Sequence, residues 1–259
     1  MQPTLGHLFG LEIHTYGAAV SLALVVGVTL ALWLRPRDTL SAGDVLNLSL
    51  IGLGAYVATP ALAFLAGALH AGRVPSEGHF SFVPTALLAA AGFAVYARVR
   101  SIPPVPALDV LVPILAVCFG VVRCLGCYLA GCCHGAPTTL PWGVVFPPGS
   151  PAHALYPGTP VHPAQLYLGL SALAVGALAL APPVRRRAAP GVAAGAALGT
   201  TAAVYLIVTF HRGDIPPDRL PWLRGGAAFL ALAALALPLA GRKAGLRPVP
   251  PTPSTRRKK

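Results

Sequence analysis

Long apolar stretches with few charges dominate this sequence and limit what it can fold into. Only 10% of the residues are charged and the mean hydropathy is +0.70, whereas about a quarter of the residues in a soluble domain are charged. A helix needs about 20 apolar residues to cross the hydrocarbon core of a bilayer. Apolar runs of roughly this length lie at residues 13–34, 45–69, 80–97, 108–130, 163–182, 191–211 and 223–240. The sequence therefore predicts an all-α integral membrane protein with seven transmembrane helices.

Basic residues are unevenly distributed over the segments that join these runs. With the N-terminus outside, all but five of the 19 Lys and Arg residues fall in inner segments. The five outer residues are Arg73, Arg123, Arg212, Arg219 and Arg224. Because basic loops stay in the cytoplasm, we expect the N-terminus outside and the C-terminus in the cytoplasm. The net charge of +12 does not indicate nucleic-acid binding, because the basic residues are dispersed between apolar runs.

One membrane domain is expected over residues 1–245, followed by a basic cytoplasmic tail over residues 246–259. No segment between the apolar runs has room for a soluble domain, which usually takes about 100 residues. Residues 1–10 contain no Lys or Arg and a long apolar run follows them, so we expect that run to remain as a membrane helix rather than to be cleaved as a signal peptide. The proline-rich tail ends in Arg-Arg-Lys-Lys, which predicts disordered chain attracted to anionic lipid.

Four of the five cysteines lie in residues 123–138 (RCLGCYLAGCCHGAPT), where an apolar run meets a long outer loop. Cys124, Cys127, Cys132 and Cys133 allow three interpretations: small packing residues, a disulfide on an oxidising outer side, or a metal site completed by His134. The stretch lies at a membrane edge and lacks a second ligand pair of the usual kind. We therefore expect packing residues and no metal.

The histidines and two arginines predict a polar site on the outer side. All eight histidines fall in outer segments or at outer helix ends, and histidine is the side chain that titrates near neutral pH. They are His7, His14, His70, His79, His134, His153, His162 and His211. Arg123 lies at the outer end of an apolar run, where an arginine is costly and usually functional, and a guanidinium binds phosphate bidentately. Arg212 can offer a second positive charge to the same headgroup, so we expect chemistry on an anionic lipid.

Two further patterns concern the framework. Gly191, Gly195 and Gly199 have the small-xxx-small spacing that lets two helix backbones approach closely. Asp109 stands near the start of the fourth apolar run, where we expect it to complement the dipole of its own helix. The outer loop over residues 135–162 is rich in Pro and Gly but contains Trp142, Phe146 and Tyr156, so it is expected to be ordered at the headgroup level.

Over nearly its whole length the chain resembles the prolipoprotein diacylglyceryl transferases, which are seven-span enzymes of the bacterial inner membrane. The matching places are residues 11–17 (LEIHTYG), Asp109, Arg123 with residues 126–135 (GCYLAGCCHG), residues 137–138 (PT), residues 140–146 (LPWGVVF) and residues 162–167 (HPAQLY). The last of these, in its setting, is quite specific.

The resemblance implies a reaction and a set of site residues. A diacylglyceryl group would move from phosphatidylglycerol to the lipobox cysteine thiol of a preprolipoprotein, with glycerol phosphate released and no metal or organic cofactor. A base would help to deprotonate the thiol, and arginines would stabilise charge on the departing phosphate. The expected catalytic residues are His162, His134 and Arg212. The expected substrate-binding residues are Arg123, Tyr16, Gly126, Gly135, Trp142, Gln165 and Tyr167. We expect a monomer in the bilayer, with the site facing outward.

The sequence also departs from the family pattern. Val83 stands at the place of a family histidine, and Tyr205 at the place of a family arginine. Cys127 and Cys132 replace an asparagine and a glutamate. One extra residue lies between Arg123 and the following glycine, and a single added residue rotates a helix by about 100°, so the phosphate site is expected to be re-aimed or rebuilt.

Two other functions remain open on these grounds. One is a divergent relative without transferase activity that binds lipid or a protein partner. The other is a membrane thiol-redox or metal protein built on the cysteine stretch. If the chain is an active transferase, His79, His134 and His211 are candidates for proton transfer in place of the missing histidine.

Overall fold

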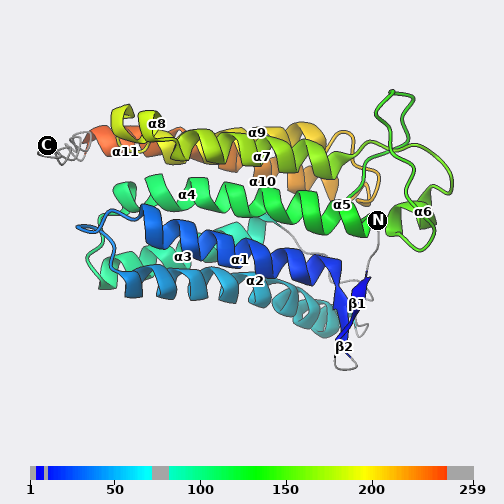
Figure 1. Ribbon diagram of the computed structural model, residues 1–259, viewed down its shortest axis with the longest axis horizontal. Helices are drawn as coiled ribbons and strands as arrows, with labels where there is room; N and C mark the ends of the chain where they lie inside the picture. The colour runs from blue at the N-terminus through cyan, green and yellow to red at the C-terminus, as the bar shows by residue number, and fades with distance from the viewer. Residues whose placement is uncertain (1–3, 9–10, 72–81, 244–259) are drawn as a thin grey trace, which may run out of the picture.

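The computed structural model describes residues 4–8, 11–71 and 82–243, and these form a bundle of long helices with the loops and a small hairpin gathered at one end (Figure 1). The long helices are α1 (Thr15–Leu34), α2 (Ala42–Ala71), α3 (Phe82–Val99), α4 (Pro104–Val121), α7 (Ala164–Leu180), α9 (Val192–Val208) and α10 (Leu220–Ala234). The shorter elements are β1 (Thr4–Leu8), β2 (Leu11–His14), the π-helical segment η1 (Val122–Cys127), α5 (Tyr128–Ala130), α6 (Pro151–Leu155), α8 (Pro182–Arg187) and α11 (Ala236–Lys243).

Helices follow all seven predicted apolar runs, which confirms a mostly helical fold. Four of the described helices are long and apolar enough to cross a membrane. They are Thr15–Leu34, Ala42–Thr59, Pro104–Ala130 and Leu220–Lys243. The apolar helices Thr85–Val99, Ala164–Leu180 and Val192–Val208 are shorter, at 10–17 residues. The count of seven spans and the orientation of the termini stay predictions, and the predicted tail over 246–259 lies outside the described residues.

The hairpin of β1 and β2 is an element that the sequence analysis did not include. The two strands pair antiparallel, with Leu8 opposite Leu11 and Thr4 opposite His14. Residues 11–14 alternate apolar and polar side chains, a period-2 pattern typical of a strand. Because α1 begins at the next residue, this short alternation is easily taken for the beginning of the helix.

Helix α4 occupies the middle of the bundle. It packs against α1 on one side and against α7 and α9 on the other, while α2 packs on α1 and on α3, and α10 packs on α9 (Figure 1). Many of the buried residues between these helices are alanines, including Ala107, Ala164, Ala194 and Ala197, each fully buried. Small residues let helix backbones approach closely in lipid, where apolar side chains gain little from leaving the hydrocarbon.

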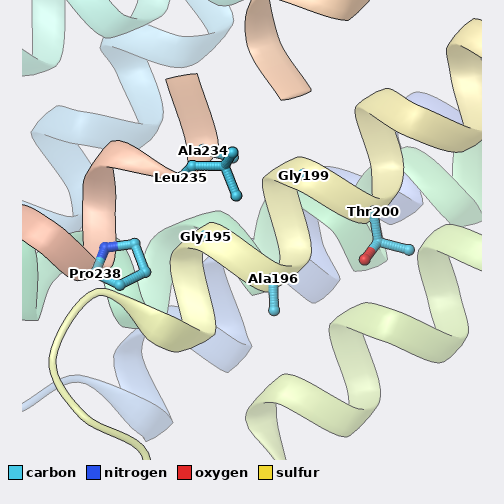
Figure 2. Close-up of a pocket in the computed structure, with 7 residues that line it drawn as sticks. All are labelled: Gly195, Ala196, Gly199, Thr200, Ala234, Leu235 and Pro238. Atoms are coloured by element: carbon cyan, nitrogen blue, oxygen red, sulfur yellow. The ribbon is translucent and has the colours of Figure 1, made fainter. Parts of the chain in front are cut away.

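The glycine spacing on α9 serves the predicted close packing. A Cβ at Gly191 would collide with the backbone of Leu237, and one at Gly195 would lie 2.8 Å from the carbonyl oxygen of Ala234. Figure 2 shows the shallow hollow that these small residues leave between α9, α10 and α11. Its volume is about 310 Å³, and it is lined by Gly195, Ala196, Gly199, Thr200, Ala234, Leu235 and Pro238. No charged side chain from the described part of the chain lines it, so we treat it as a packing feature rather than a candidate site.

Asp109 caps a helix, but not its own. Its two carboxylate oxygens accept hydrogen bonds from the backbone N–H groups of Gly191, at 2.6 Å, and Ala194, at 2.9 Å. Gly191 is the N-cap residue of α9, where a carboxylate satisfies unpaired N–H groups and complements the helix dipole. The expected cap on the fourth helix is therefore corrected to a link between α4 and α9, which no pattern local to residue 109 reveals.

Charge is segregated between the two ends of the bundle. Basic residues cluster where α1, α3 and α11 end and where α8 joins α7 to α9. They are Arg35, Arg37, Arg98, Arg100, Arg185, Arg186, Arg187, Arg242 and Lys243. The elements at the opposite end carry all the histidines among the described residues. They lie in β1, at the N-cap of α1, in the last turn of α2, in α6 and in the loops after α5, α6 and α9. The predicted orientation would place the basic end of the bundle on the inner side and the histidine-rich end on the outer side.

Replacing Asp109 by Ala should lower the free energy of unfolding by about 1 kcal/mol or more, because two N–H groups of α9 lose their acceptor. Thermal unfolding of the detergent-solubilised protein measures the change. Asp38→Ala, at an exposed acid in the loop that follows α1, is the matched control and should leave stability unchanged. Equal stability of the Asp109→Ala variant and the wild type would contradict the assigned cap.

Candidate functional site

The loops at the histidine-rich end form an ordered layer that ties α5, α7 and α9 together. Gly135 N–H donates to the His162 carbonyl at 2.9 Å, His162 N–H donates to the Ala136 carbonyl at 3.0 Å, and Ala136 N–H donates to the His211 carbonyl at 2.7 Å. Phe146 and Val161 are buried in a small apolar cluster of the same layer. The loop predicted to be ordered is thus held by backbone hydrogen bonds and by its own core.

Gly135 is the crossing point of this layer. A Cβ there would collide with the Cβ of His162 and would lie 2.8 Å from the carbonyl oxygens of His162 and His211. Gly213 is equally confined, since its Cβ would lie 2.6 Å from the carbonyl oxygen of Gly135. The structure therefore gives Gly135, predicted to bind substrate, a framework position that sets where His162 and His211 stand.

Arg123 is buried at the end of α4, inside η1, with only 8% of its surface exposed. Its guanidinium lies over the Phe119 ring, 4.9 Å from the centroid, and its Nη1 donates to the Cys127 sulfur at 3.8 Å. The absent side chain of Gly126 lets α1 approach, since a Cβ there would lie 3.2 Å from Cδ2 of Tyr16. The structure therefore brings Arg123, Gly126 and Tyr16 together.

The π-helical geometry of η1 gives the extra residue after Arg123 a place. A π turn closes hydrogen bonds over one more residue than an α turn, so it takes up a single added residue within the turn. The chain resumes α-helical geometry at Tyr128, and Gly126 still faces α1. The expected rotation of about 100° is thus absorbed locally, within the turn that holds the arginine.

Arg212 approaches the same loop from the end of α9. Its Nε and Nη2 donate to the two carboxylate oxygens of Asp214 at 2.5 and 2.6 Å. The side chain is only 5% exposed, and Nη1 has no hydrogen-bond partner among the described residues. The resulting group is a fixed, charge-compensated guanidinium with one donor still available.

Three cysteine sulfurs lie beside these arginines. The Sγ atoms of Cys127, Cys132 and Cys133 all lie within 4.8 Å of one another. Hydrogen bonds from the Cys127 and Cys132 thiols, together with the positive charges of Arg123 and Arg212, hold the pKa of the Cys133 thiol well below its ordinary value. Both guanidinium groups are thus close enough to act on one thiol, although they come from different helices.

The other two cysteines, Cys118 and Cys124, pack against neighbouring helices. The Cys118 sulfur contacts the Ala23 carbonyl of α1 at 3.2 Å. Cys124 lies against α7, where a Cβ on Gly169 would collide with its sulfur. All five cysteines fall within the described residues and all are free thiols, so the disulfide alternative is not formed in this structure.

His162, Tyr167 and Trp142 form a hydrogen-bonded chain. The Trp142 indole N–H donates to the Tyr167 hydroxyl at 2.8 Å, and that hydroxyl lies 3.2 Å from Nδ1 of His162. The ring of His211 stands 5.0 Å from that of His162, centroid to centroid. Burial, and then the charge of His211, lower the pKa of His162. This lowered pKa favours the neutral imidazole of His162, which is half-buried in the loop layer.

Gln165 and His134 are enclosed, each with 0% of its surface exposed. Gln165 donates from Nε2 to the Cys132 carbonyl at 2.7 Å, which fastens the cysteine turn to α7. His134 Nδ1 lies 2.9 Å from the Gly135 carbonyl oxygen, and its ring meets Tyr156 edge-on. Gln165 Oε1 and His134 Nε2 find no partner in the part of the chain that the structure describes. Neither side chain is open to a substrate in this conformation.

Two residues at the site were missed by the sequence analysis. Asp214 neutralises Arg212, and the short spacing of the two charges after a helix end was the available signal. Arg224, from α10, donates to the side chain and carbonyl of Thr209 at 3.4 and 3.3 Å and lies over the Phe210 ring at 4.0 Å. Its role depends on packing between α9 and α10, for which the sequence offers no local signal. Val83 lies in α3, and Tyr205 is buried on α9.

The arrangement can bind an anion and accept a proton. Two buried guanidinium groups both act electrostatically on Cys133, and away from bulk solvent their attraction for an anion is stronger than in water. One of them keeps an unused donor, and a neutral imidazole stands in the same loop layer. This combination suits a reaction in which a phosphate leaves and a thiol loses its proton.

Comparison with known proteins gives a consistent result. The sequence model of the prolipoprotein diacylglyceryl transferase family matches residues 3–240. A phosphatidylglycerol–prolipoprotein diacylglyceryl transferase of Clostridium tetani is 28% identical over 175 residues, which cover 64% of this chain and 68% of that protein. A second enzyme of that name, from Clostridium perfringens, is 29% identical over 192 residues, covering 68% and 70%. Because the family match extends over most of its length, this chain belongs to the prolipoprotein diacylglyceryl transferases, a family of membrane-bound transferases.

Proposed function

We propose that this protein transfers the diacylglyceryl group of phosphatidylglycerol to the lipobox cysteine thiol of a preprolipoprotein. Family membership and the names of the two clostridial relatives support this substrate pair. The observation that carries the proposal is the buried pair of arginines, in which Nη1 of Arg212 has no partner among the described residues. A charged donor left unpaired out of water is costly, and a phosphate oxygen would satisfy it.

The charge change in the reaction explains why two arginines are useful. The thiol sulfur attacks the glyceryl carbon that carries the phosphate, a C–S bond forms, the C–O bond breaks, and glycerol phosphate leaves with the bonding electron pair. The phosphodiester carries one negative charge, and the departing phosphate gains another. Arg123 and Arg212 therefore interact more strongly with the transition state than with the bound lipid, which is the condition for raising the rate.

His162 is the base that the geometry favours. In the tautomer whose Nδ1–H donates to the Tyr167 hydroxyl, Nε2 carries the lone pair that accepts the thiol proton. Trp142 fixes the hydroxyl from its other side. The alternative base His134 is fully buried, with 0% of its surface exposed. His79 lies outside the described residues. His211 neighbours His162 and tunes it through charge.

The remaining site residues position Arg123 and His162 and form the wall of the site. Tyr16 and Gly126 form the wall that α1 presents to Arg123, and the Tyr16 hydroxyl is held by Tyr56 at 3.1 Å. Gln165 and Gly135 hold the loop layer to which the base belongs. Seven spans, an N-terminus outside and a monomer in the bacterial inner membrane complete the proposal, with the loop layer on the outer side.

Arg123→Ala should reduce the rate of diacylglyceryl transfer by about 100-fold or more, the usual effect of removing one group that stabilises developing negative charge. Arg123→Lys keeps the charge but loses the planar fork, so its rate should also fall. The assay follows labelled diacylglycerol from phosphatidylglycerol to a lipobox peptide.

Arg219→Ala is the control for the two Arg123 variants, because Arg219 is an exposed arginine at the same end of the bundle. Its rate should equal that of the wild type. A wild-type protein that is folded and binds lipid but shows no turnover would instead favour a lipid- or partner-binding relative without transferase activity.

Asp214→Ala should lower the transfer rate by about tenfold or more, because Arg212 loses the carboxylate that holds its guanidinium in place, and small misplacements of a catalytic group are costly. Asp218→Ala changes an exposed acid of the same loop and should have no effect. Equal rates for both variants would show that the ion pair does not position Arg212 for the reaction.

His211→Gln should raise the pKa of His162, since one of the two causes that lower it is removed. Transfer needs neutral His162, so the acid limb of the rate–pH profile should move to higher pH in this variant. His153→Gln, in α6, should leave the profile in place. The lowered pKa also means that the unfolded chain takes up this proton more readily, so His162 costs stability as the pH falls below about 6.5.

A further inference from the structure

Cys127, Cys132 and Cys133 bring three sulfur atoms to one place from two parts of the chain. Cys127 ends the π-helical segment η1, while the other two follow the single turn of α5. Their Sγ atoms lie within 4.8 Å of one another. The transfer reaction uses none of these thiols, because its sulfur nucleophile belongs to the protein substrate.

The turn that carries Cys132 and Cys133 is held from three directions. The Cys132 N–H donates to the Cys127 carbonyl at 3.1 Å, Gln165 donates to the Cys132 carbonyl at 2.7 Å, and Ala152 N–H donates to the Gly131 carbonyl at 3.1 Å. The sulfurs are therefore placed by a fixed backbone rather than gathered by flexible loops. Such preorganisation lowers the free-energy cost of binding a ligand.

The spacing of the sulfurs suits a metal ion. Zinc–thiolate bonds of about 2.3 Å in tetrahedral geometry place sulfur atoms about 3.8 Å apart. Three thiols already within 4.8 Å reach that spacing through small side-chain rotations. A disulfide, at about 2.05 Å, needs a much larger approach, and all three thiols are free here.

The surroundings also fit the charge of such a site. Three thiolates around a divalent cation carry one net negative charge, which a neighbouring cation would balance. Arg123 donates to the Cys127 sulfur at 3.8 Å, and Arg123 and Arg212 both act electrostatically on Cys133. Donors to ligating sulfur are the outer interactions that tune metal sites. Cys132 and Cys133 are each partly exposed rather than fully enclosed.

We propose that Cys127, Cys132 and Cys133 form a three-thiolate site for one thiophilic d¹⁰ cation, Zn²⁺ or Cu⁺. Thiolate ligands select these soft ions over the hard cations Mg²⁺ and Ca²⁺. Binding releases the thiol protons to solvent and forms one metal–sulfur bond at each cysteine, with no change of oxidation state. The bound ion would cross-link η1 to the cysteine turn, directly beside the two arginines. This site does not depend on the transferase proposal.

Metal titration of the full chain tests the site. The protein in detergent is reduced, stripped with a chelator and titrated with Cd²⁺, whose sulfur-to-metal charge-transfer absorption reports thiolate ligation. Competition with a chromogenic chelator then gives the affinities for Zn²⁺ and for Cu⁺ and identifies the preferred ion. We expect saturation at one ion per chain, with the charge-transfer band of three thiolates.

The metal affinities of single Cys→Ser variants show which cysteines are ligands. Cys127→Ser, Cys132→Ser and Cys133→Ser should each weaken binding by at least about tenfold, since even the loss of an outer-shell partner costs that much. Cys124→Ser and Cys118→Ser should bind as the wild type does. The preferred ion should raise the Tm of the wild type but not that of the triple serine variant, which tests the site even where one variant folds poorly.

Three results would overturn the proposal: no saturable uptake by the reduced wild type, an equal loss of affinity in Cys124→Ser, or a disulfide among the three cysteines in a protein that takes up no metal after reduction. Transfer activity is not the readout. Failure of the metal site and failure of the transferase proposal therefore remain distinguishable.

Discussion

The cost of keeping Arg123 out of water organises the end of the bundle where the candidate site lies. A guanidinium is always charged, and an apolar environment penalises it unless other groups compensate. The Phe119 ring and the Cys127 sulfur offer it weak, polarisable contacts. The neighbouring Arg212 is instead balanced by Asp214. The Nη1 of Arg212 still lacks a partner among the described residues, and the proposed phosphate would supply one.

The backbone crossing at Gly135 fixes that charge relative to the proposed base. Hydrogen bonds run from this loop to the chain at His162 and at His211, and the glycine has no room for a side chain. The imidazole pair and Arg212 are therefore held by one small piece of main chain. Backbone hydrogen bonds in this layer can thus fix the positions of site residues without a large apolar core. This suits a site between a helical bundle and a lipid headgroup region.

Much of the fold could be predicted because its signals are local. The apolar runs gave the long helices, the glycines on α9 gave a close helix contact, and the histidines gave the polar end of the bundle. Arg123 was predicted as a site residue from its type and setting, whereas the role of His162 was implied by the family resemblance. The structure places His162 beside Tyr167, and Arg123 acts electrostatically on Arg212. A charge in an apolar run is rare enough to be recognised without a structure.

Other features depend on packing between distant parts of the chain and could not be predicted. The partner of Asp109 lies about 80 positions away in sequence, and which three of the five cysteines meet depends on the turn after α5. The π turn is a further case. Its six residues have the sequence of an ordinary apolar helix, and only the comparison with the family pattern shows that one residue is added. The hairpin had a local signal, but its alternation is only four residues long.

The carboxylate that joins α4 to α9 has a mechanical consequence. At its far end α4 is fixed to α9 through Asp109, and at its near end the chain continues through η1 into the hydrogen-bonded loops. A rod anchored at both ends cannot slide along its axis, so α4 keeps its depth in the bilayer while other helices shift. Any helix movement that the proposed transfer reaction requires would then fall to helices without such a double anchor, such as α2, which packs on α1 and α3.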